Sequence, residues 1–384
     1  MGIFKGSCTF SRYYSPRTDV DPFEIDIEGA LKRNAAPDIE AAGESATVGW
    51  ATPSHLLDTD FTLEKVLHGD WLFLVMRTDR RTVSESLVNA YLQIELDAAA
   101  HAGKPLSRGA RADLKDAIRA DLLKRTLPRV SGVDFAWNLK KGTALFASRS
   151  NSATDAMLAL FTETFGFSLS RADVRETVAR KGDEEKLYLF SDLLPAAFHS
   201  RDAKAPEPGA PLPLADEFVG REFLTWLWFA AEEGGGEFVL PDGTAVGLAV
   251  EDYLVFSSGS EGQRSILRNG TPTLSAEAAT ALASGRMLEK VRLTLSDGEE
   301  EWAFVLDADG LGVSSAKLPR GEERHPAGRM RERAESLLRL SSYVDGLFWN
   351  FLDVRLSEEE WEGERVRVCE WVERKNERAR SKNA

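Results

Sequence analysis

The chain has 384 residues with 48 Lys or Arg against 62 Asp or Glu, a formal net charge of −14. Its hydrophobic fraction of 43% suits an ordinary globular protein, which excludes disorder over most of the length and predicts about two domains. The acidic balance argues against a protein that coats nucleic acid with its whole surface, although it leaves room for a local basic surface. We find no apolar run long enough for a signal peptide or a membrane span, and therefore expect a cytoplasmic protein without a membrane partner.

Strands and helices alternate in the first half of the chain. Residues 69–79 (GDWLFLVMRTD) are rich in large apolar side chains and predict a strand. Two helices are predicted over residues 84–103 and 106–125, with Ser84 and Ser107 as their N-caps. A hairpin is predicted over residues 133–148, turning at 139–142, and a further helix over residues 151–166. Helices and strands at this spacing indicate an α+β fold.

A proline-rich stretch divides the chain. Five prolines lie between Leu194 and Leu214, which predicts an extended connector. We therefore predict an N-terminal α+β half over residues 1–193, a connector over 194–215 and a C-terminal α+β half over 216–384, each with mostly antiparallel sheet and packed helices. The C-terminal half is expected to contain a long helix over residues 329–356 and a polar tail, 372–384, that frays.

Residue patterns that carry catalytic or metal chemistry are missing from the sequence. The five histidines are widely separated, and the two cysteines, Cys8 and Cys369, are too few for a disulfide framework or a zinc site. Acidic runs at 299–301 and 358–360 are expected at a hairpin tip and at a helix start, where solvation and the helix dipole account for them. We expect no enzyme activity, no catalytic residues, no metal, no cofactor and no small-molecule substrate.

Positive charge gathers in one segment. Between Lys104 and Arg149 there are eleven Lys or Arg against four Asp, a local net of +7 in a chain whose remainder sums to −21. In the predicted helix over 106–125, Leu114, Ile118 and Leu122 form an apolar stripe expected to be buried, beside a basic stripe that includes Lys115 and Arg119. The basic residues continue past the helix and into the hairpin turn at Lys124, Arg125, Arg129, Lys140 and Lys141. Charge alone leaves two interpretations open: a solvated helix face, or a footprint for nucleic acid.

The order of motifs narrows this choice. The succession TVGW (47–50), GDWLFLVMRTDRRTV (69–83), LSR…LKDAIRADLLKRTLPR (106–129) and DFAWNLKKGTALFASRSNSATDAMLALFTETFG (134–166) resembles the RdgC family of bacterial proteins associated with recombination. The resemblance covers about residues 1–170 well, and the second half more loosely. It implies a ring-shaped homodimer whose positively charged hole binds double-stranded DNA without marked sequence preference. It also implies functional antagonism of the RecA recombinase, a nucleoid location and no catalysis.

Individual positions follow the resemblance unevenly. Arg125 and Arg129 match basic positions of the family motif, whereas Lys124 stands where the family often has proline. Leu127 stands where the family has a phenylalanine, which makes it the expected dimer contact. In the second half, residues 269–271 replace a Lys-Lys-Gln motif, so Arg264 and Arg268 are the expected DNA contacts there.

We therefore predict a non-enzymatic, sequence-independent DNA-binding protein that encircles DNA and limits RecA access. The predicted DNA-binding residues are Lys115, Arg119, Lys124, Arg125, Arg129, Lys140, Lys141, Arg264 and Arg268. The alternative is a protein-interaction scaffold that keeps the fold and has lost DNA binding, for which the strong net acidity and the changed 269–271 loop argue.

Overall fold

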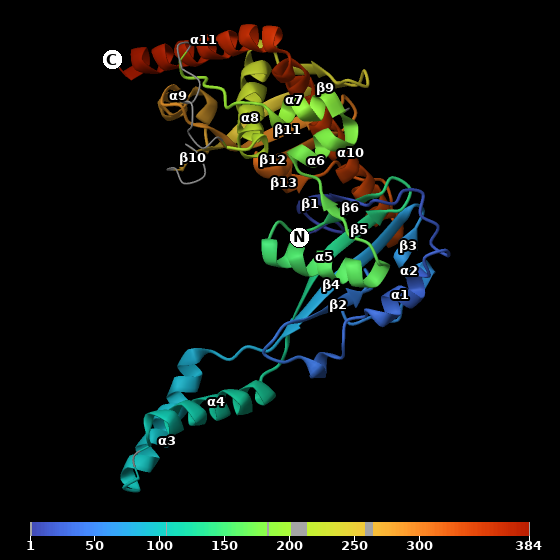
Figure 1. Cartoon of the computed structure of the whole chain (residues 1–384), viewed down its shortest axis with the longest axis vertical. Coiled ribbons are helices and arrows are strands. Elements are labelled where there is room, and N and C mark those ends of the chain that lie inside the picture. The colour runs from blue at the N-terminus through green and yellow to red at the C-terminus, as the bar shows by residue number, and fades with distance from the viewer. Residues whose placement is uncertain (1, 105, 183, 201–212, 258–263, 384) are drawn as a thin grey trace. The chain divides into compact units, whose positions relative to one another are not determined.

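The computed structural model describes residues 2–104, 106–182, 184–200, 213–257 and 264–383 (Figure 1). It is an α+β protein whose named strand pairs are antiparallel, as the sequence predicts. The chain forms two compact units, which we call unit 1 (Met1–Thr18, Ala136–Ser150 and Leu169–Ala384) and unit 2 (Asp19–Phe135 and Asn151–Ser168). These units divide the chain differently from the predicted domains, because the N-terminal strand pairs with a strand near residue 313.

Unit 1 contains a sheet in the order β10-β9-β11-β12-β13-β1-β6, with β7 beside β1 and β8 beside β9. Its strands are β1 (Cys8–Tyr14), β6 (Thr143–Phe146), β7 (Ser170–Arg171), β8 (Glu237–Val239), β9 (Ala245–Ser257), β10 (Ser265–Arg268), β11 (Met287–Ser296), β12 (Glu301–Asp307) and β13 (Gly312–Lys317). Its helices are α6 (Val174–Lys181), α7 (Glu184–Ser191), α8 (Ala215–Glu233), α9 (Ala276–Ala283), α10 (Pro326–Leu356) and α11 (Glu358–Asn383), with 3₁₀ turns at Pro272–Leu274 and Asp309–Leu311.

The core of unit 1 forms where α8 packs on β11 and β9. Alternate residues of β11 are buried, including Val291, Leu293 and Leu295, which leaves the residues between them on the opposite face of the sheet. Trp228 of α8 lies against Phe256 of β9 at 6.3 Å between ring centroids. Burial of these large side chains is the main stabilisation of the unit, at about 25 cal/mol per Å² of apolar surface.

The strands of unit 2 follow the order β5-β4-β2, and the short strand β3 also pairs with β4. Its strands are β2 (Thr47–Ala51), β3 (Leu67–His68), β4 (Trp71–Arg80) and β5 (Arg129–Asn138), of which the last three residues belong to unit 1. Its helices are α1 (Ile27–Arg33), α2 (Leu63–Val66), α3 (Glu85–His101), α4 (Arg108–Arg125) and α5 (Asn151–Phe165), with a 3₁₀ turn at Ile39–Ala41.

Aromatic side chains fill the core of unit 2. Trp50 of β2, Phe135 of β5 and Phe161 of α5 are fully buried and follow one another at 5.4 and 5.8 Å between ring centroids. The Trp50 indole N–H donates to the Thr164 hydroxyl at 2.8 Å, so the one polar atom of the ring is satisfied. α1 and α5 pack on each other, and α5 also packs on β2, which gives the unit its helical layer.

The polar tail differs from its predicted state. Residues 372–383 continue α11 instead of fraying, because Lys375 is held by partners distant in the sequence. Its ammonium group donates to Glu232 Oε1 of α8 at 2.9 Å and to the Thr273 carbonyl at 2.9 Å. Much of the predicted connector, residues 201–212, lies outside the described residues. In the described ranges, the structure contains no helix with both the length and the apolar character to cross a bilayer.

Candidate nucleic-acid interface

The basic helix α4 packs on α3 (Figure 1). Both helices begin at the predicted serine caps. The Ser84 and Ser107 hydroxyls accept hydrogen bonds from the N–H groups of Leu87 and Ala110 at 3.3 and 3.2 Å. The burial of the apolar stripe on α4 is less complete than predicted. Leu122 is buried, but Leu114 and Ile118 are only half-buried. A pair of helices with so few buried residues gains little from its own packing and presents most of its surface to solvent.

Two predicted contact residues on α4 share one carboxylate. Lys115 Nζ lies 3.0 Å from Glu85 Oε2, and the Arg119 guanidinium pairs with the other oxygen of Glu85, which is the first residue of α3. Each of these three side chains is partly exposed, so the pairs are surface pairs worth about 0–1 kcal/mol each. Glu85 therefore neutralises part of the predicted basic stripe without removing it from solvent.

The C-terminal exit of α4 has a different charge environment. Lys124 and Arg129 are exposed, and neither forms an ion pair with any carboxylate in the described part of the chain. Arg125 lies between them and has only a long pair with Asp121, 3.5 Å away on the same helix. We call Lys124, Arg125 and Arg129 the exit cluster. Its net charge is uncompensated, because it gathers three cations beside a single weakly paired acid.

Arg81, at the end of β4, fixes the position of this exit. Its Nη1 donates to three carbonyl oxygens at the C-terminus of α4, those of Leu123, Lys124 and Thr126, at 3.4, 3.2 and 3.0 Å. Carbonyl groups in the last turn of a helix have no partner within the helix, and a cation there also complements the helix dipole. Arg81 thus satisfies the end of α4 and holds the exit cluster next to the sheet of unit 2.

Leu127, the predicted dimer contact, lies inside the exit cluster. Its side chain is 88% exposed and therefore gains almost none of the stabilisation that burial gives an aliphatic side chain. Other exposed apolar residues follow one face of α3 at helical spacing, namely Leu87, Tyr91 and Ile94. The structure contains one chain, so the contact predicted for Leu127 stays a prediction.

The hairpin lysines belong to unit 1. Lys140 and Lys141 are exposed at the turn between β5 and β6, and neither ammonium group has a partner in the described ranges. The turn is tight. Gly142 has φ of 65°, and a Cβ there would lie 2.8 Å from the Arg17 carbonyl oxygen. The Lys141 N–H donates to Asn138 Oδ1 at 2.8 Å, so the backbone of both lysines is fixed while their side chains remain free to reach an anion.

The two predicted contacts of the second half lie at the edge strand β10, also in unit 1. Arg264 Nε donates to Glu289 Oε2 at 2.8 Å, so its charge is compensated. Arg268 has no carboxylate partner among the described residues, and its guanidinium lies over the ring of Tyr253 at 5.0 Å from the centroid. Asn269 and Gly270 follow in a left-handed turn with φ of 67° and 70°. Only Arg268 of this pair is available to an anionic ligand.

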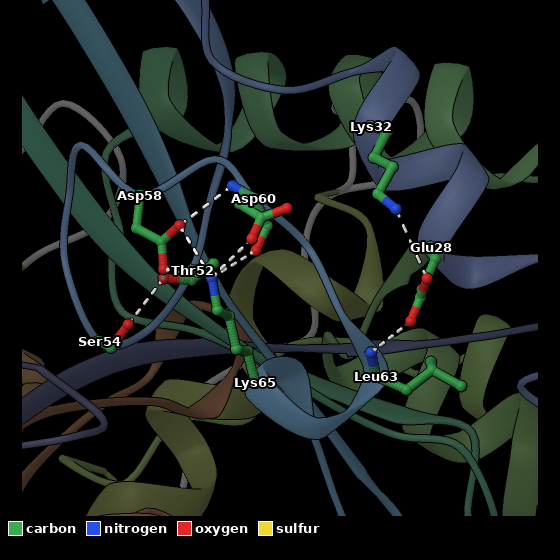
Figure 2. A network of polar contacts seen from close by, with 8 residues as sticks. All are labelled: Glu28, Lys32, Thr52, Ser54, Asp58, Asp60, Leu63 and Lys65. Atoms are coloured by element: carbon green, nitrogen blue, oxygen red, sulfur yellow. Dashed lines mark hydrogen bonds and ion pairs between the residues drawn. The ribbon is translucent and has the colours of Figure 1, made fainter.

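An acidic cluster in unit 2 holds an internal cation of its own (Figure 2). Lys65 Nζ lies 3.1 Å from Asp58 Oδ2 and 3.2 Å from Asp60 Oδ2, and the Thr52 hydroxyl donates to Asp58 Oδ2 at 3.0 Å. Burial opposes ionisation of Asp58, but bonds from the Asp60 N–H, Lys65 and Thr52 outweigh it and lower the pKa of Asp58. Across the described ranges, we find no group of three or more His, Cys, Asp or Glu arranged to hold a metal ion.

Two residues of this charge map could not be identified from the sequence: Glu85 and Arg81. Glu85 was visible as an acid in the first turn of a predicted helix, where the helix dipole already accounts for it. Its role on α4 depends on the packing of two helices, and Arg81 acts on carbonyls more than forty residues away in sequence. No local pattern carries either interaction.

The comparison with known families matches this part of the molecule. Residues 12–181 match a family model described as "Putative exonuclease, RdgC". Over these residues the chain is similar to the RdgC family. The RdgC match includes α3, α4, the exit cluster and the hairpin lysines, and it ends before the strand that carries Arg268. Curated proteins yielded no match.

Proposed function

We propose that this chain is a non-enzymatic protein that binds double-stranded DNA without sequence preference and acts in recombination. The observation that carries the proposal is the exit cluster. Lys124 and Arg129 are exposed and lack a carboxylate partner within the described residues, inside the segment that matches the family model. Phosphates attract such cations regardless of base sequence, and the release of counterions from DNA drives the binding.

The hairpin contributes a second set of phosphate contacts in this proposal. Lys140 and Lys141 are exposed on a turn whose backbone is already held by the bond from the Lys141 N–H to Asn138, so only their side chains have to be ordered when they bind a phosphate. The acidic remainder of the chain repels DNA from other surfaces and confines binding to the basic ones. Binding would then obstruct growth of the RecA filament by occupying the duplex. We propose that two chains form a ring around DNA, with Leu127 at a subunit contact.

A fluorescence anisotropy titration tests the DNA part of the proposal. Two labelled duplexes of equal length and unrelated sequence are titrated at two salt concentrations. We expect equal affinities for both duplexes and a steep loss of affinity at the higher salt concentration. Binding that is insensitive to salt, or confined to one sequence, contradicts the proposal. Incubation of the same DNA with Mg²⁺ or Mn²⁺ tests the absence of catalysis, which shortening of the DNA would contradict.

Encirclement needs a separate test, because a simple groove also binds phosphate. The protein is loaded on closed circular DNA and on the same DNA made linear, and both are washed at high salt. A ring is retained on the circle and slides off the linear ends, whereas a groove is lost from both. Sizing of the protein with and without duplex DNA gives the number of chains per complex.

The second candidate function is a protein-interaction scaffold. Two observations favour it: the exposed apolar stripe of α3, Leu87, Tyr91 and Ile94, and the partial neutralisation of Lys115 and Arg119 by Glu85. Exposed apolar patches mark surfaces that bind other proteins. A protein partner captured by the wild type but not by an Ile94→Asp variant, and retained after nuclease treatment, would favour the scaffold.

A further inference from the structure

A basic cavity of about 370 Å³ lies on unit 1, outside the segment that matches the family model. Its lining comes from five neighbouring strands or the turns that follow them: Asp252, Tyr253, Arg268, Asn269, Lys290, Arg292, Val305, Ser314 and Ser315. A volume of this size is that of a site for a small organic ligand. The strand register explains why these residues meet.

The register aligns the lining across the sheet. Arg268 of β10 is paired with Tyr253 of β9, and Arg292 of β11 is paired with Val305 of β12, which in turn is paired with Ser314 of β13. The pairing of β9 with β11 shifts between Val291 and Leu293, opposite residues 251–253, so a bulge interrupts the row next to Tyr253. Val291 and Leu293 are buried on the face that α8 covers. Lys290 and Arg292 therefore project from the other face, into the cavity.

Positive charge exceeds negative charge in this lining. Arg292 Nη1 lies 3.3 Å from Asp252 Oδ1, and both side chains are more than 40% exposed, so a stronger anion can compete for Arg292. Lys290 Nζ lies 2.6 Å from Asp307 Oδ2, but Arg149 Nη1 lies 2.9 Å from the same oxygen, so one carboxylate serves two cations. Arg268 adds a further charge with no carboxylate partner among the described residues. The site is suited to an anion.

An aromatic side chain, that of Tyr253, lines the same cavity as these cations. The Arg268 guanidinium lies over the Tyr253 ring at 5.0 Å, which is within the range of a cation–π contact. Aromatic rings and guanidinium planes are the surfaces on which unpaired bases stack. Arg292 and Lys290, on the neighbouring strand β11, supply donors for a phosphate. The cavity thus combines cations that suit a phosphate, Lys290 and Arg292, with a planar pair that suits a base, Tyr253 and Arg268.

We propose that this cavity binds a nucleoside phosphate, with the phosphate on Arg292 and Lys290 and the base on the Tyr253–Arg268 pair. The ligand is either a free nucleotide or one unit of a single strand, which share this chemistry. The proposal goes beyond the proposed function, because duplex DNA offers no unstacked base for such a site to bind.

Calorimetric titration of the full chain with dTMP, thymidine and inorganic phosphate tests the proposal. We expect dTMP to bind more tightly than either of its halves. Tyr253→Leu is expected to weaken dTMP binding at least about fivefold while leaving phosphate binding unchanged, as loss of one base stack predicts. Arg292→Ala is expected to weaken both dTMP and phosphate. Arg264→Ala is the matched control, since Arg264 is paired with Glu289 and does not line the cavity.

Arg268→Lys separates the contribution of stacking from that of charge. It also tests stacking independently if the Tyr253→Leu variant does not fold. It retains the positive charge but loses the planar group, so dTMP binding should fall while phosphate binding persists. A labelled d(T)8 oligonucleotide distinguishes a free nucleotide from one nucleotide of a single strand as the ligand. Tighter binding of d(T)8 than of dTMP indicates a single strand, and equal binding indicates a free nucleotide.

Three results would overturn the proposal: no heat with dTMP, phosphate binding as tight as dTMP binding, or a Tyr253→Leu variant that folds and binds dTMP normally. These failures are distinguishable from failure of the proposed function. Duplex binding depends on the exit cluster, so a Lys124→Ala/Arg129→Ala variant should lose duplex affinity and keep its affinity for dTMP.

Discussion

The arginine at the end of α10 and the basic residues at the end of α4 differ in their surroundings. Arg355 is 6% exposed, and its Nε donates to Glu222 Oε2 at 2.8 Å, while its Nη2 donates to the Leu194 carbonyl at 2.5 Å. Glu222 is fully buried. Lys124 and Arg129 are exposed and have no carboxylate partner among the described residues. The first cation is committed to the fold, whereas the other two are available to a ligand.

The comparison shows why a count of charges could not separate candidate binding residues from cations that stabilise the fold. The same residue types serve as internal counterions in one region and as exposed cations in the other. Burial separates the two uses. Removing a buried partner leaves an uncompensated charge at low dielectric, whereas removing an exposed cation leaves only water in its place.

The largest expected effect concerns the buried pair. Arg355→Ala leaves the Glu222 carboxylate without its cation, and should lower the free energy of unfolding by about 3–5 kcal/mol. Burial already raises the pKa of Glu222, and Arg355 opposes that rise. Denaturant unfolding at neutral pH measures the change.

Arg331→Ala on the same helix is the matched control for this prediction. Arg331 pairs with Glu335 one turn away at 3.7 Å, and both side chains are about half exposed. Its loss should lower the free energy of unfolding by no more than about 0.5 kcal/mol. Equal effects of the two substitutions would contradict the distinction between buried and exposed cations.

A smaller effect is expected at Glu85, where the two uses of charge overlap. Glu85→Gln removes the shared partner of Lys115 and Arg119 and frees both cations. Duplex DNA affinity should rise a few-fold, since each surface pair is worth about 0–1 kcal/mol. Anisotropy titration at low salt measures the rise, with Glu95→Gln on the exposed surface of the same helix as control. An unchanged affinity for Glu85→Gln would place Lys115 and Arg119 outside the interface.

A further effect appears only at high pH and concerns a half-buried pair between these extremes. The Tyr343 hydroxyl donates to Asp297 Oδ2 at 2.8 Å. Burial, followed by this bond, raises the pKa of Tyr343 to about 12. Neutral Tyr343 therefore contributes stability that is fully present below pH 10 and is lost as the pH rises toward 12.

Tyr343→Phe removes this titration. Between pH 10 and 12, the free energy of unfolding of the wild type should fall more steeply with pH than that of the variant. Urea unfolding of both proteins across this range measures the difference. Parallel curves would show that Tyr343 titrates alike in the folded and unfolded chains.

Local signals predicted much of the fold. The caps Ser84 and Ser107 and the apolar run of β4 are predicted from a few adjacent residues, and the structure places them as expected. Interactions between distant segments were not accessible in this way. The helical tail is held by Glu232, more than a hundred residues before Lys375, so its polar sequence gave no sign of anchoring.

The candidate site divides along the same line. The position of the basic residues on α4 and in the hairpin turn follows from sequence spacing alone. The sequence does not show which of these basic residues are neutralised, because Glu85 reaches Lys115 and Arg119 only after α3 folds against α4. The cavity under Arg268 depends on the register of five strands, which no single segment encodes.

The salt dependence of duplex DNA affinity tests the central claim most directly. The slope of log K against log salt is compared for the wild type, Lys124→Ala/Arg129→Ala and Lys115→Ala/Arg119→Ala. Loss of two phosphate contacts should flatten the slope by about 2 in the first variant, and by less in the second because Glu85 already neutralises part of its charge. A slope unchanged by Lys124→Ala/Arg129→Ala would contradict DNA binding through the exit cluster.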